Sequence, residues 1–216
     1  MSLWIKICGT TSLEDAQLAV DAGADAIGFV FAPSPRQVTI ERAAAITASL
    51  PAAVEKIGVF VDATLAELEA AVQTGGLTGV QLHSGIRPEM PAQLKRRFGP
   101  DLRVLRVVHY AADAAAQAES IAADANVDAV LVDSRTATAV GGTGISFDWS
   151  AAQSLFHGAR KPMVVAGGLR HENVAEAIRT LQPWGVDVVS GVESAPGSKD
   201  AAKVRAFIAN ARAAAR

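Results

Sequence analysis

Eight short apolar runs recur along this chain of 216 residues, with helix-type stretches between them. The runs are nearly continuous in apolar residues rather than strictly alternating, which is typical of parallel strands covered by helices. Eight strand–helix units without a linker or low-complexity segment predict a single (β/α)8 barrel domain spanning residues 1–216. The expected strands are 3–8, 25–31, 56–61, 78–83, 102–108, 128–133, 162–167 and 186–191.

Two of the expected helices carry recognisable start signals. Thr11 and Glu14 have the spacing of a capping box, and Thr64 and Glu67 repeat it. In a capping box, the hydroxyl and the carboxylate bind backbone N–H groups that the first helical turn leaves without partners. Both stretches end at glycine, which readily adopts the left-handed conformation that terminates helices. These signals place one helix after the first strand and another after the third.

An open, doubly wound parallel sheet is the competing arrangement for alternating strands and helices. Such sheets often bind dinucleotides through a G-x-G-x-x-G loop after the first strand. No such loop follows the first strand here, and the number of units is eight. Both observations favour the closed barrel.

Composition limits the classes of partner and the setting. The net charge is −2 and the pI is near 6.1, without a basic block, so we expect no nucleic-acid partner. A single cysteine excludes an internal disulfide and a cysteine-rich zinc site. No signal-like start and no apolar run near 18 residues is present, so we expect a cytoplasmic protein without membrane association.

Reactive side chains stand at the ends of four expected strands: Cys8, Asp62, His83 and Asp133. In (β/α)8 barrels, chemistry is carried out where the carboxyl ends of the strands meet. We therefore expect these side chains to project toward one shared mouth. A lone cysteine is more often a small buried hydrophobe, so Cys8 needs further support as a reactive group.

Three glycine-containing turns occur late in the chain, where barrels often bind phosphate. Glycine lets backbone N–H groups approach a phosphate closely, and a following helix N-terminus adds positive potential. Plain turn geometry also needs glycine, but three such turns favour a cradle for a phosphorylated small molecule. The predicted phosphate-binding residues are Gly142 and Gly144 in "GGTG", Gly167 and Gly168 in "AGGL", and Ser190 and Gly191 in "VSGVES".

An ordered set of motifs connects these features. It comprises "KICGTT", "GADAIGFVFAPSPRQV", "IGVFVD", "VQLH", "LVDS", "GGTG..FDW", "AGGL..ENV..AI" and "GVDVVSGVESAPGSKD". Together, from about residue 4 to about residue 207, they resemble the phosphoribosylanthranilate isomerase family of tryptophan biosynthesis. Each motif alone is weak, whereas the set in this order is highly specific.

The resemblance implies an Amadori rearrangement of N-(5′-phosphoribosyl)anthranilate to 1-(2-carboxyphenylamino)-1-deoxyribulose 5-phosphate. An acid protonates the furanose ring oxygen, and a base removes the proton from C2′ of the opened iminium. The resulting enolamine then tautomerises to the ketone. Only protons move, so no cofactor and no metal are expected, in keeping with a sequence that lacks dinucleotide and metal motifs.

Matched onto this chain, the resemblance makes Cys8 the general base and Asp133 the general acid. Arg36 matches the residue for the anthranilate carboxylate, an anion that a forked guanidinium suits. A free thiol has a pKa near 8.5, so Cys8 would have to be biased toward thiolate. The backbone N–H groups where the chain turns into the following helix are the expected source of that bias. Asp133 must hold a proton to act as an acid.

Other interpretations remain open at this point. Arg36 could be a solvent-facing loop charge, and Asp133 could cap a turn. Asp62 and His83 could be hydrogen-bonded structural residues as readily as residues of the mouth. The oligomeric state, monomer or homodimer, is undecided by the Ala-rich outer helices.

Other functions are also possible on this fold. Indole-glycerol-phosphate synthase and the α subunit of tryptophan synthase use barrels with phosphate sites, but with lysine or glutamate sets. A histidine-pathway isomerase with the same chemistry typically has an aspartate where Cys8 stands. A hydrolase pairing Cys8 with His83 and a non-catalytic phosphate-binding barrel are the remaining alternatives.

Overall fold

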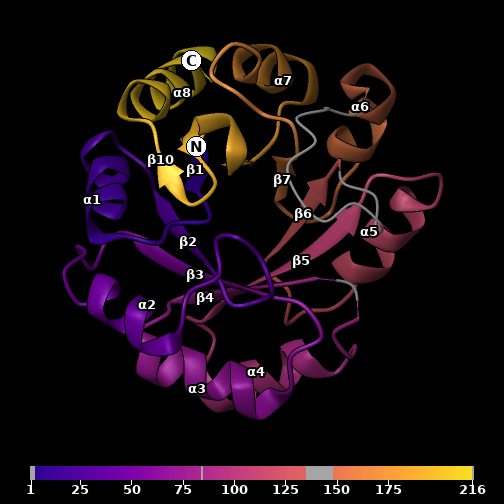
Figure 1. Ribbon diagram of the computed structural model, residues 1–216. Coiled ribbons are helices and arrows are strands. Elements are labelled where there is room, and N and C mark those ends of the chain that lie inside the picture. Colours follow the sequence, from indigo (N-terminus) through magenta and orange to yellow (C-terminus); the bar gives the residue numbers. More distant parts are fainter. Residues whose placement is uncertain (1–2, 84, 135–147, 216) are drawn as a thin grey trace.

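The eight strands close into a parallel barrel. The computed structural model describes residues 3–83, 85–134 and 148–215. Each strand pairs with the next in chain order, and the last pairs with the first (Figure 1). The fold class predicted from the sequence is therefore confirmed. The barrel strands are β1 (Trp4–Ile7), β2 (Ala26–Val30), β3 (Glu55–Phe60), β4 (Gly79–Leu82), β5 (Arg103–His109), β6 (Ala129–Asp133), β7 (Met163–Ala166) and β8 (Gly185–Val188).

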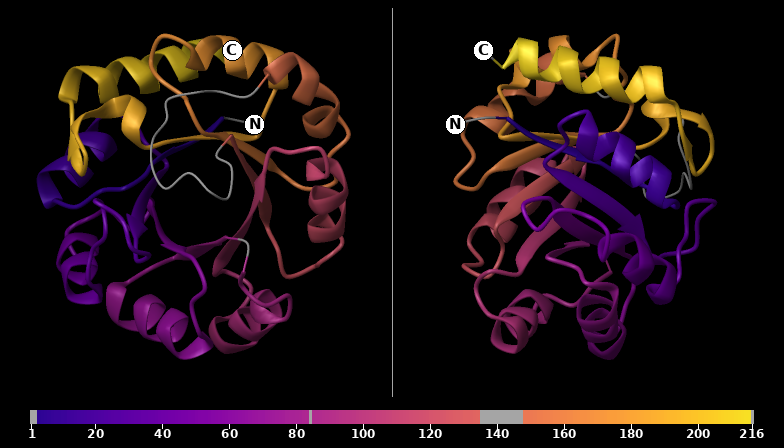
Figure 2. Two further views of the ribbon diagram at one scale, coloured as in Figure 1. Left: turned by 45° about the vertical axis from the view of Figure 1, so that its right-hand side comes forward. Right: turned by 90° about the vertical axis from the view of Figure 1, so that its left-hand side faces the viewer.

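The helices form an outer ring around these strands, with α8 beside α1, so the two ends of the chain close the ring (Figures 1 and 2). No helix within the described residues is long and apolar enough to cross a membrane. The helices are α1 (Leu13–Asp21), α2 (Ile40–Thr47), α3 (Leu65–Gly75), α4 (Met90–Phe98), α5 (Ala114–Ala122), α6 (Trp149–His157), α7 (Val174–Leu181) and α8 (Ala201–Ala214).

One of the two expected capping boxes forms. Thr64 and Glu67 cap α3 reciprocally, as predicted, and Gly76 ends that helix with a φ of 65°. The other expectation is wrong: Ser12, not Thr11, is the N-cap of α1, and its Oγ accepts from the N–H of Asp15. The Thr11 hydroxyl instead donates to the Gly197 carbonyl at 2.7 Å. A long-range contact with the end of the chain thus takes the residue that local spacing assigned to the cap.

Two apolar layers hold the barrel. A large one fills the space between strands and helices, and a smaller one fills the barrel interior. Alternate residues along each strand point inward. The interior cluster consists of Trp4, Ala26, Ile57, Leu105, Val107, Ala129, Leu131, Val164 and Ala166, with Trp184 packed against it.

At the amino ends of the strands, the barrel has a floor made of Trp4, Glu55, Arg103 and Trp184. Trp4 and Trp184 stack with ring centroids 5.1 Å apart, and the Arg103 guanidinium lies over the Trp184 ring at 5.4 Å. Arg103 Nε also donates to Glu55 Oε2 at 2.6 Å. These contacts close the end opposite the mouth.

The chain after β8 differs from the sequence prediction, which extended the last strand to residue 191. The strand ends at Val188, and a 3₁₀ turn, η1 (Ser190–Val192), follows. A small hairpin of β9 (Glu193–Ala195) and β10 (Ser198–Lys199) then leads into α8. This hairpin brings charged residues back over the mouth of the barrel.

Candidate active site

Alternate residues of each strand point into the barrel interior. Four potentially reactive side chains lie where these inward-facing residues reach the mouth, at the carboxyl ends of the strands. Cys8 directly follows β1, continuing the series of Trp4 and Lys6, and Asp133 is the last residue of β6. His83 directly follows β4, and His109 ends β5 opposite Asp133 in the strand register. The structure thus places the predicted Cys8, His83 and Asp133 around one opening.

Cys8 lies packed against the second strand. Its side chain is buried, and a Cβ added to Gly28 would lie only 2.5 Å from the Cys8 Sγ. Burial raises the pKa of this thiol above its ordinary value, although the positive charges of Lys6 and Lys199 oppose the rise. In the unliganded protein, burial and the charge of Asp187 thus disfavour the thiolate that the proposed base needs, and its two lysine neighbours favour it.

A buried polar layer lies one step below Cys8 in the barrel interior. Lys6 Nζ donates to Gln81 Oε1 at 2.8 Å and to Asp187 Oδ1 at 2.9 Å. Lys6 is fully buried and Asp187 is 5 % exposed. Burial alone would lower the pKa of Lys6, but Asp187 and Cys8 raise it. The ion pair of Lys6 with Asp187 thus lies beneath the thiol.

Asp133 is almost completely buried at the opposite part of the mouth. A Cβ added to Gly167 would lie 2.5 Å from Asp133 Oδ1, so the predicted phosphate turn after β7 is packed directly against this carboxyl. The His83 and His109 rings lie near each other, with centroids 5.8 Å apart. His109 Nδ1 is buried and has no hydrogen-bond partner within the described part of the chain.

Arg36 is not a solvent-facing loop charge. Its side chain is buried, with Nε donating to Glu193 Oε1 at 2.8 Å and Nη2 donating to Glu193 Oε2 at 2.6 Å. The hydrogen bonds that Arg36 donates to the Glu193 carboxylate raise the pKa of Arg36. The loop after β2 is thus tied to the hairpin after β8.

The two predicted phosphate turns that the structure describes are in contact. Gly167 and Gly168 have positive φ of 80° and 66°, which glycine adopts without strain. A Cβ added to Gly191 would collide with the backbone carbonyl of Leu169, so the turn after β8 packs on the turn after β7. Ser190 begins this second turn. Gly142 and Gly144 lie outside the described residues.

Asp62 lies just after the end of β3. It is exposed and has a left-handed φ of 52°, and its carboxylate lies against the backbone at Gly85. It lines a separate hollow of about 320 Å³ together with the stacked rings of Phe31 and Phe60. Its role at the mouth stays a prediction, and its contact with the Gly85 backbone supports the alternative of a structural residue in the loop after β3.

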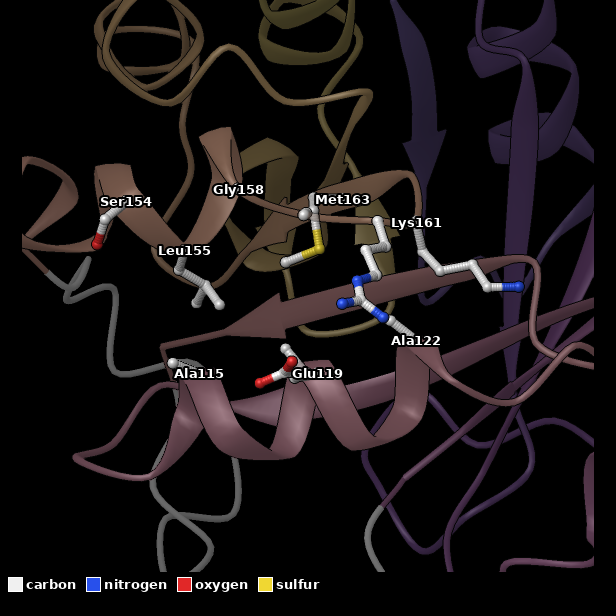
Figure 3. Close-up of a pocket in the computed structure, with 11 residues that line it drawn as sticks. Ala115, Glu119, Ala122, Ser154, Leu155, Gly158, Lys161 and Met163 are labelled. Atoms are coloured by element: carbon white, nitrogen blue, oxygen red, sulfur yellow. The ribbon is translucent and has the colours of Figure 1, made fainter.

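A groove of about 300 Å³ lies outside the barrel between α5 and α6 (Figure 3). Alanines of α5 line one wall, and Lys161 and Met163 lie where the chain enters β7. None of the predicted site residues lines this groove. No three His, Cys, Asp or Glu side chains in the described ranges lie close enough together to hold a metal ion.

Sequence reasoning missed five buried polar residues at or below the mouth: Lys6, Gln81, Asp187, Glu193 and Lys199. Three of them carried a usable signal. Lys6 and Gln81 stand two positions before Cys8 and His83, so strand alternation directs all four side chains inward, and Asp187 is a charge within an apolar strand. Glu193 and Lys199 follow the last barrel strand, where no periodicity reveals their partners.

Comparison with known proteins identifies the family. The model of the N-(5'phosphoribosyl)anthranilate (PRA) isomerase family matches residues 5–210. An N-(5'-phosphoribosyl)anthranilate isomerase of Pelobacter propionicus is 47 % identical over 205 residues, covering 94 % of this chain and 93 % of that protein.

Solved structures agree. A phosphoribosyl anthranilate isomerase in complex with reduced 1-(o-carboxyphenylamino)-1-deoxyribulose 5-phosphate has a TM-score of 0.82 at 34 % identity, covering 98 % of this chain and 99 % of its own. A structure of monomers generated from the dimeric enzyme of Thermotoga maritima has a TM-score of 0.80 at 35 % identity, covering 97 % and 98 %. The chain therefore belongs to the N-(5'-phosphoribosyl)anthranilate isomerase family, enzymes of tryptophan biosynthesis.

Proposed function

We propose that Cys8 and Asp133 carry the Amadori rearrangement of N-(5′-phosphoribosyl)anthranilate, as general base and general acid. One observation supports this most directly. The two residues are buried at the carboxyl ends of β1 and β6, with β7 and β8 between them, and both belong to inward-facing series. An acid and a base on opposite parts of one opening suit a sugar that must gain a proton at one atom and lose one at another.

Ring opening is the first step. Asp133 donates its proton to the furanose ring oxygen, the bond from C1′ to that oxygen breaks, and the anthranilate nitrogen supplies electrons to form an iminium. A carboxyl that is 2 % exposed suits this role, because exclusion of water keeps the proton for the substrate. The turn at Gly167, packed on Asp133, keeps the acid close to the predicted phosphate cradle.

Proton removal from C2′ is the second step. Cys8 must accept this proton as a thiolate, although burial raises the pKa of the free thiol. The iminium is cationic, so it stabilises the thiolate at the stage that needs it, in addition to Lys6 below. The cationic iminium and Lys6 therefore both favour the thiolate form that this step requires. The enolamine then tautomerises to the ketone.

The substrate's two anionic ends have separate sites in this proposal. The anthranilate carboxylate binds Arg36, whose guanidinium is suited to a planar anion. The phosphate binds the backbone of the turns that contain Gly167, Gly168, Ser190 and Gly191, with Gly142 and Gly144 as further predicted members. A phosphorylated small molecule is thus the expected partner, and the relatives include dimeric and monomeric forms.

Two substitutions test the proposed roles. Asp133→Asn keeps the shape but cannot give up a proton usefully, and Cys8→Ser places a hydroxyl that does not ionise near neutrality. Each should lower kcat by at least about a hundredfold, the lower end expected for general acid–base groups. The measurement is the loss of phosphoribosylanthranilate fluorescence, with thermal unfolding as the control for folding. Near-normal turnover in folded Cys8→Ser would make Cys8 a buried hydrophobe instead.

A further inference from the structure

The Arg36 side chain is held at both its ends. Gly9, with a φ of 71°, makes room for its arm, since a Cβ there would lie 2.8 Å from Arg36 Cδ. Glu193 binds the guanidinium through two hydrogen bonds of 2.6 and 2.8 Å. The aliphatic part of the Arg36 side chain therefore crosses the turn that directly follows Cys8. Its guanidinium group is fixed by a residue 157 positions away in the chain.

Lys199 completes this cluster. Its Nζ donates to the Cys8 carbonyl at 2.5 Å and lies 3.3 Å from Glu193 Oε1. The Gly197 N–H donates to the same Glu193 oxygen at 3.2 Å. Burial lowers the pKa of Lys199, whereas Glu193 and Cys8 favour its charged form. β9 and β10 are thereby connected to the backbone of Cys8.

The charges of this cluster do not cancel. Arg36 and Lys199 are cations, and within the described residues Glu193 is the carboxylate that pairs with both. Glu193 occupies Nε and Nη2 of Arg36, while Nη1 has no hydrogen-bond partner in the described ranges. An excess positive charge and an unused edge of a fixed guanidinium together suit a carboxylate ligand.

We propose that Glu193 is a positioning residue, which holds the Arg36 guanidinium in the orientation that receives the anthranilate carboxylate. This inference rests on the proposed role of Arg36. Glu193 itself does not bind the substrate, because its two oxygens are used by Arg36, Lys199 and Gly197. It acts by ordering a long side chain before the substrate arrives, so that binding does not have to order it.

The first experiment compares Glu193→Gln with a matched control. Glutamine keeps the shape but loses the charge and the forked contact. KM for phosphoribosylanthranilate should rise about tenfold, the size expected when a long side chain must be ordered on binding, with a smaller change in kcat. Competitive inhibition by anthranilate should weaken, whereas inhibition by inorganic phosphate should not. Glu55→Gln, which breaks the Arg–Glu pair on the barrel floor, should leave KM unchanged.

The second experiment places Glu193→Gln in an Arg36→Met background. If Glu193 acts through Arg36, its substitution should add little to the rise in KM that Arg36→Met already causes. An equal factor in both backgrounds would overturn the inference, as would an unchanged KM in folded Glu193→Gln. Should Glu193→Gln not fold, Glu193→Asp keeps the charge but shortens the fork, and it should still raise KM.

The results also separate this inference from the proposed function. If Arg36→Met itself leaves KM and anthranilate inhibition unchanged, the carboxylate site is wrongly assigned. If Arg36→Met raises KM and Glu193→Gln does not, only the positioning role fails.

Discussion

The barrel has an Arg–Glu pair at each end, and the two differ in their surroundings. Glu55 and Arg103 meet on the floor at 2.6 Å, with side chains 24 % and 31 % exposed. Glu193 and Arg36 meet at the mouth, also at 2.6 Å, with side chains 4 % and 10 % exposed. At the floor the Arg103 guanidinium face covers Trp184, whereas at the mouth the Arg36 arm crosses the turn after Cys8.

The comparison separates stability from function on one fold. The floor pair is electrically neutral, partly hydrated and packed on stacked tryptophans, so it closes the barrel at little cost. The mouth holds two cations on one carboxylate in a buried place, an arrangement that costs desolvation energy. A buried excess of positive charge next to Cys8 destabilises the unliganded protein, and it is expected where the site must bind a ligand carboxylate. This is the usual division between the two faces of such barrels.

The largest expected effect comes from Lys6, between floor and mouth. Lys6→Met leaves Asp187 buried without its cation, so the free energy of unfolding should fall by about 3–5 kcal/mol, the usual cost of removing one partner of a buried pair. Denaturant unfolding measures this. The same variant should raise the pH midpoint of Cys8 alkylation by iodoacetamide, because a charge that favours the thiolate is removed. An unchanged midpoint would mean that Lys6 serves only to fill the barrel.

Much of the fold could be predicted from local pattern. The eight strands lie within about two residues of the apolar runs, except that the last ends at Val188, because the chain turns there to form η1 and the hairpin. Apolar runs and glycine stops act over a few residues, so a sequence displays them directly. Thr11 shows the limit, since its partner is the carbonyl of Gly197.

Less of the candidate site than of the fold could be predicted from the sequence. Cys8, Asp133 and Arg36 could be named from motifs, and strand ends brought His83 to the mouth. No pattern in the sequence connects Arg36 with Glu193, or Cys8 with Lys199, because these contacts join the two ends of the closed ring. The direction of the Cys8 pKa also required the structure, since it depends on burial competing with two lysines. Asp62 lines a separate hollow with Phe31 and Phe60, a contact that strand-end position alone does not reveal.

An intermediate effect should appear in the pH dependence of stability. Burial alone would raise the pKa of Glu193, but the Arg36 hydrogen bonds and the Lys199 charge outweigh it and lower that pKa below the ordinary 4.5. A carboxyl group whose pKa is lower in the folded state than in the unfolded state stabilises the protein at pH values above its unfolded-state pKa. This stabilisation is lost as the pH falls through the folded-state pKa.

Glu193→Gln should therefore be less stable than the parent at pH 7 by about 1–3 kcal/mol, the cost of leaving buried donors without a charged acceptor. The difference should shrink as the pH falls below 4.5. Denaturant unfolding at several pH values measures it. At pH 7, Glu55→Gln should cost no more than about 1 kcal/mol, as a partly exposed pair does. A difference for Glu193→Gln that is constant from pH 7 to pH 3 would contradict the assigned charge.

A last comparison concerns two glycines that lie at opposite ends of the last barrel strand. Gly185 begins β8 at the floor, where a Cβ would lie 2.9 Å from the Trp4 ring and backbone, and Gly191 follows β8 at the mouth, where a Cβ would meet the Leu169 carbonyl. Neither has a positive φ, so alanine changes crowding rather than backbone conformation at both positions. Overpacking of this kind costs about 1–3 kcal/mol.

Gly185→Ala should therefore lower the free energy of unfolding without changing KM. Gly191→Ala should push the turns after β7 and β8 apart and raise KM about tenfold, equivalent to about 1.4 kcal/mol, with weaker inhibition by inorganic phosphate. Steady-state kinetics beside denaturant unfolding distinguishes the two. If both glycines change stability alone, the turn at Gly191 is packing and the phosphate lies elsewhere.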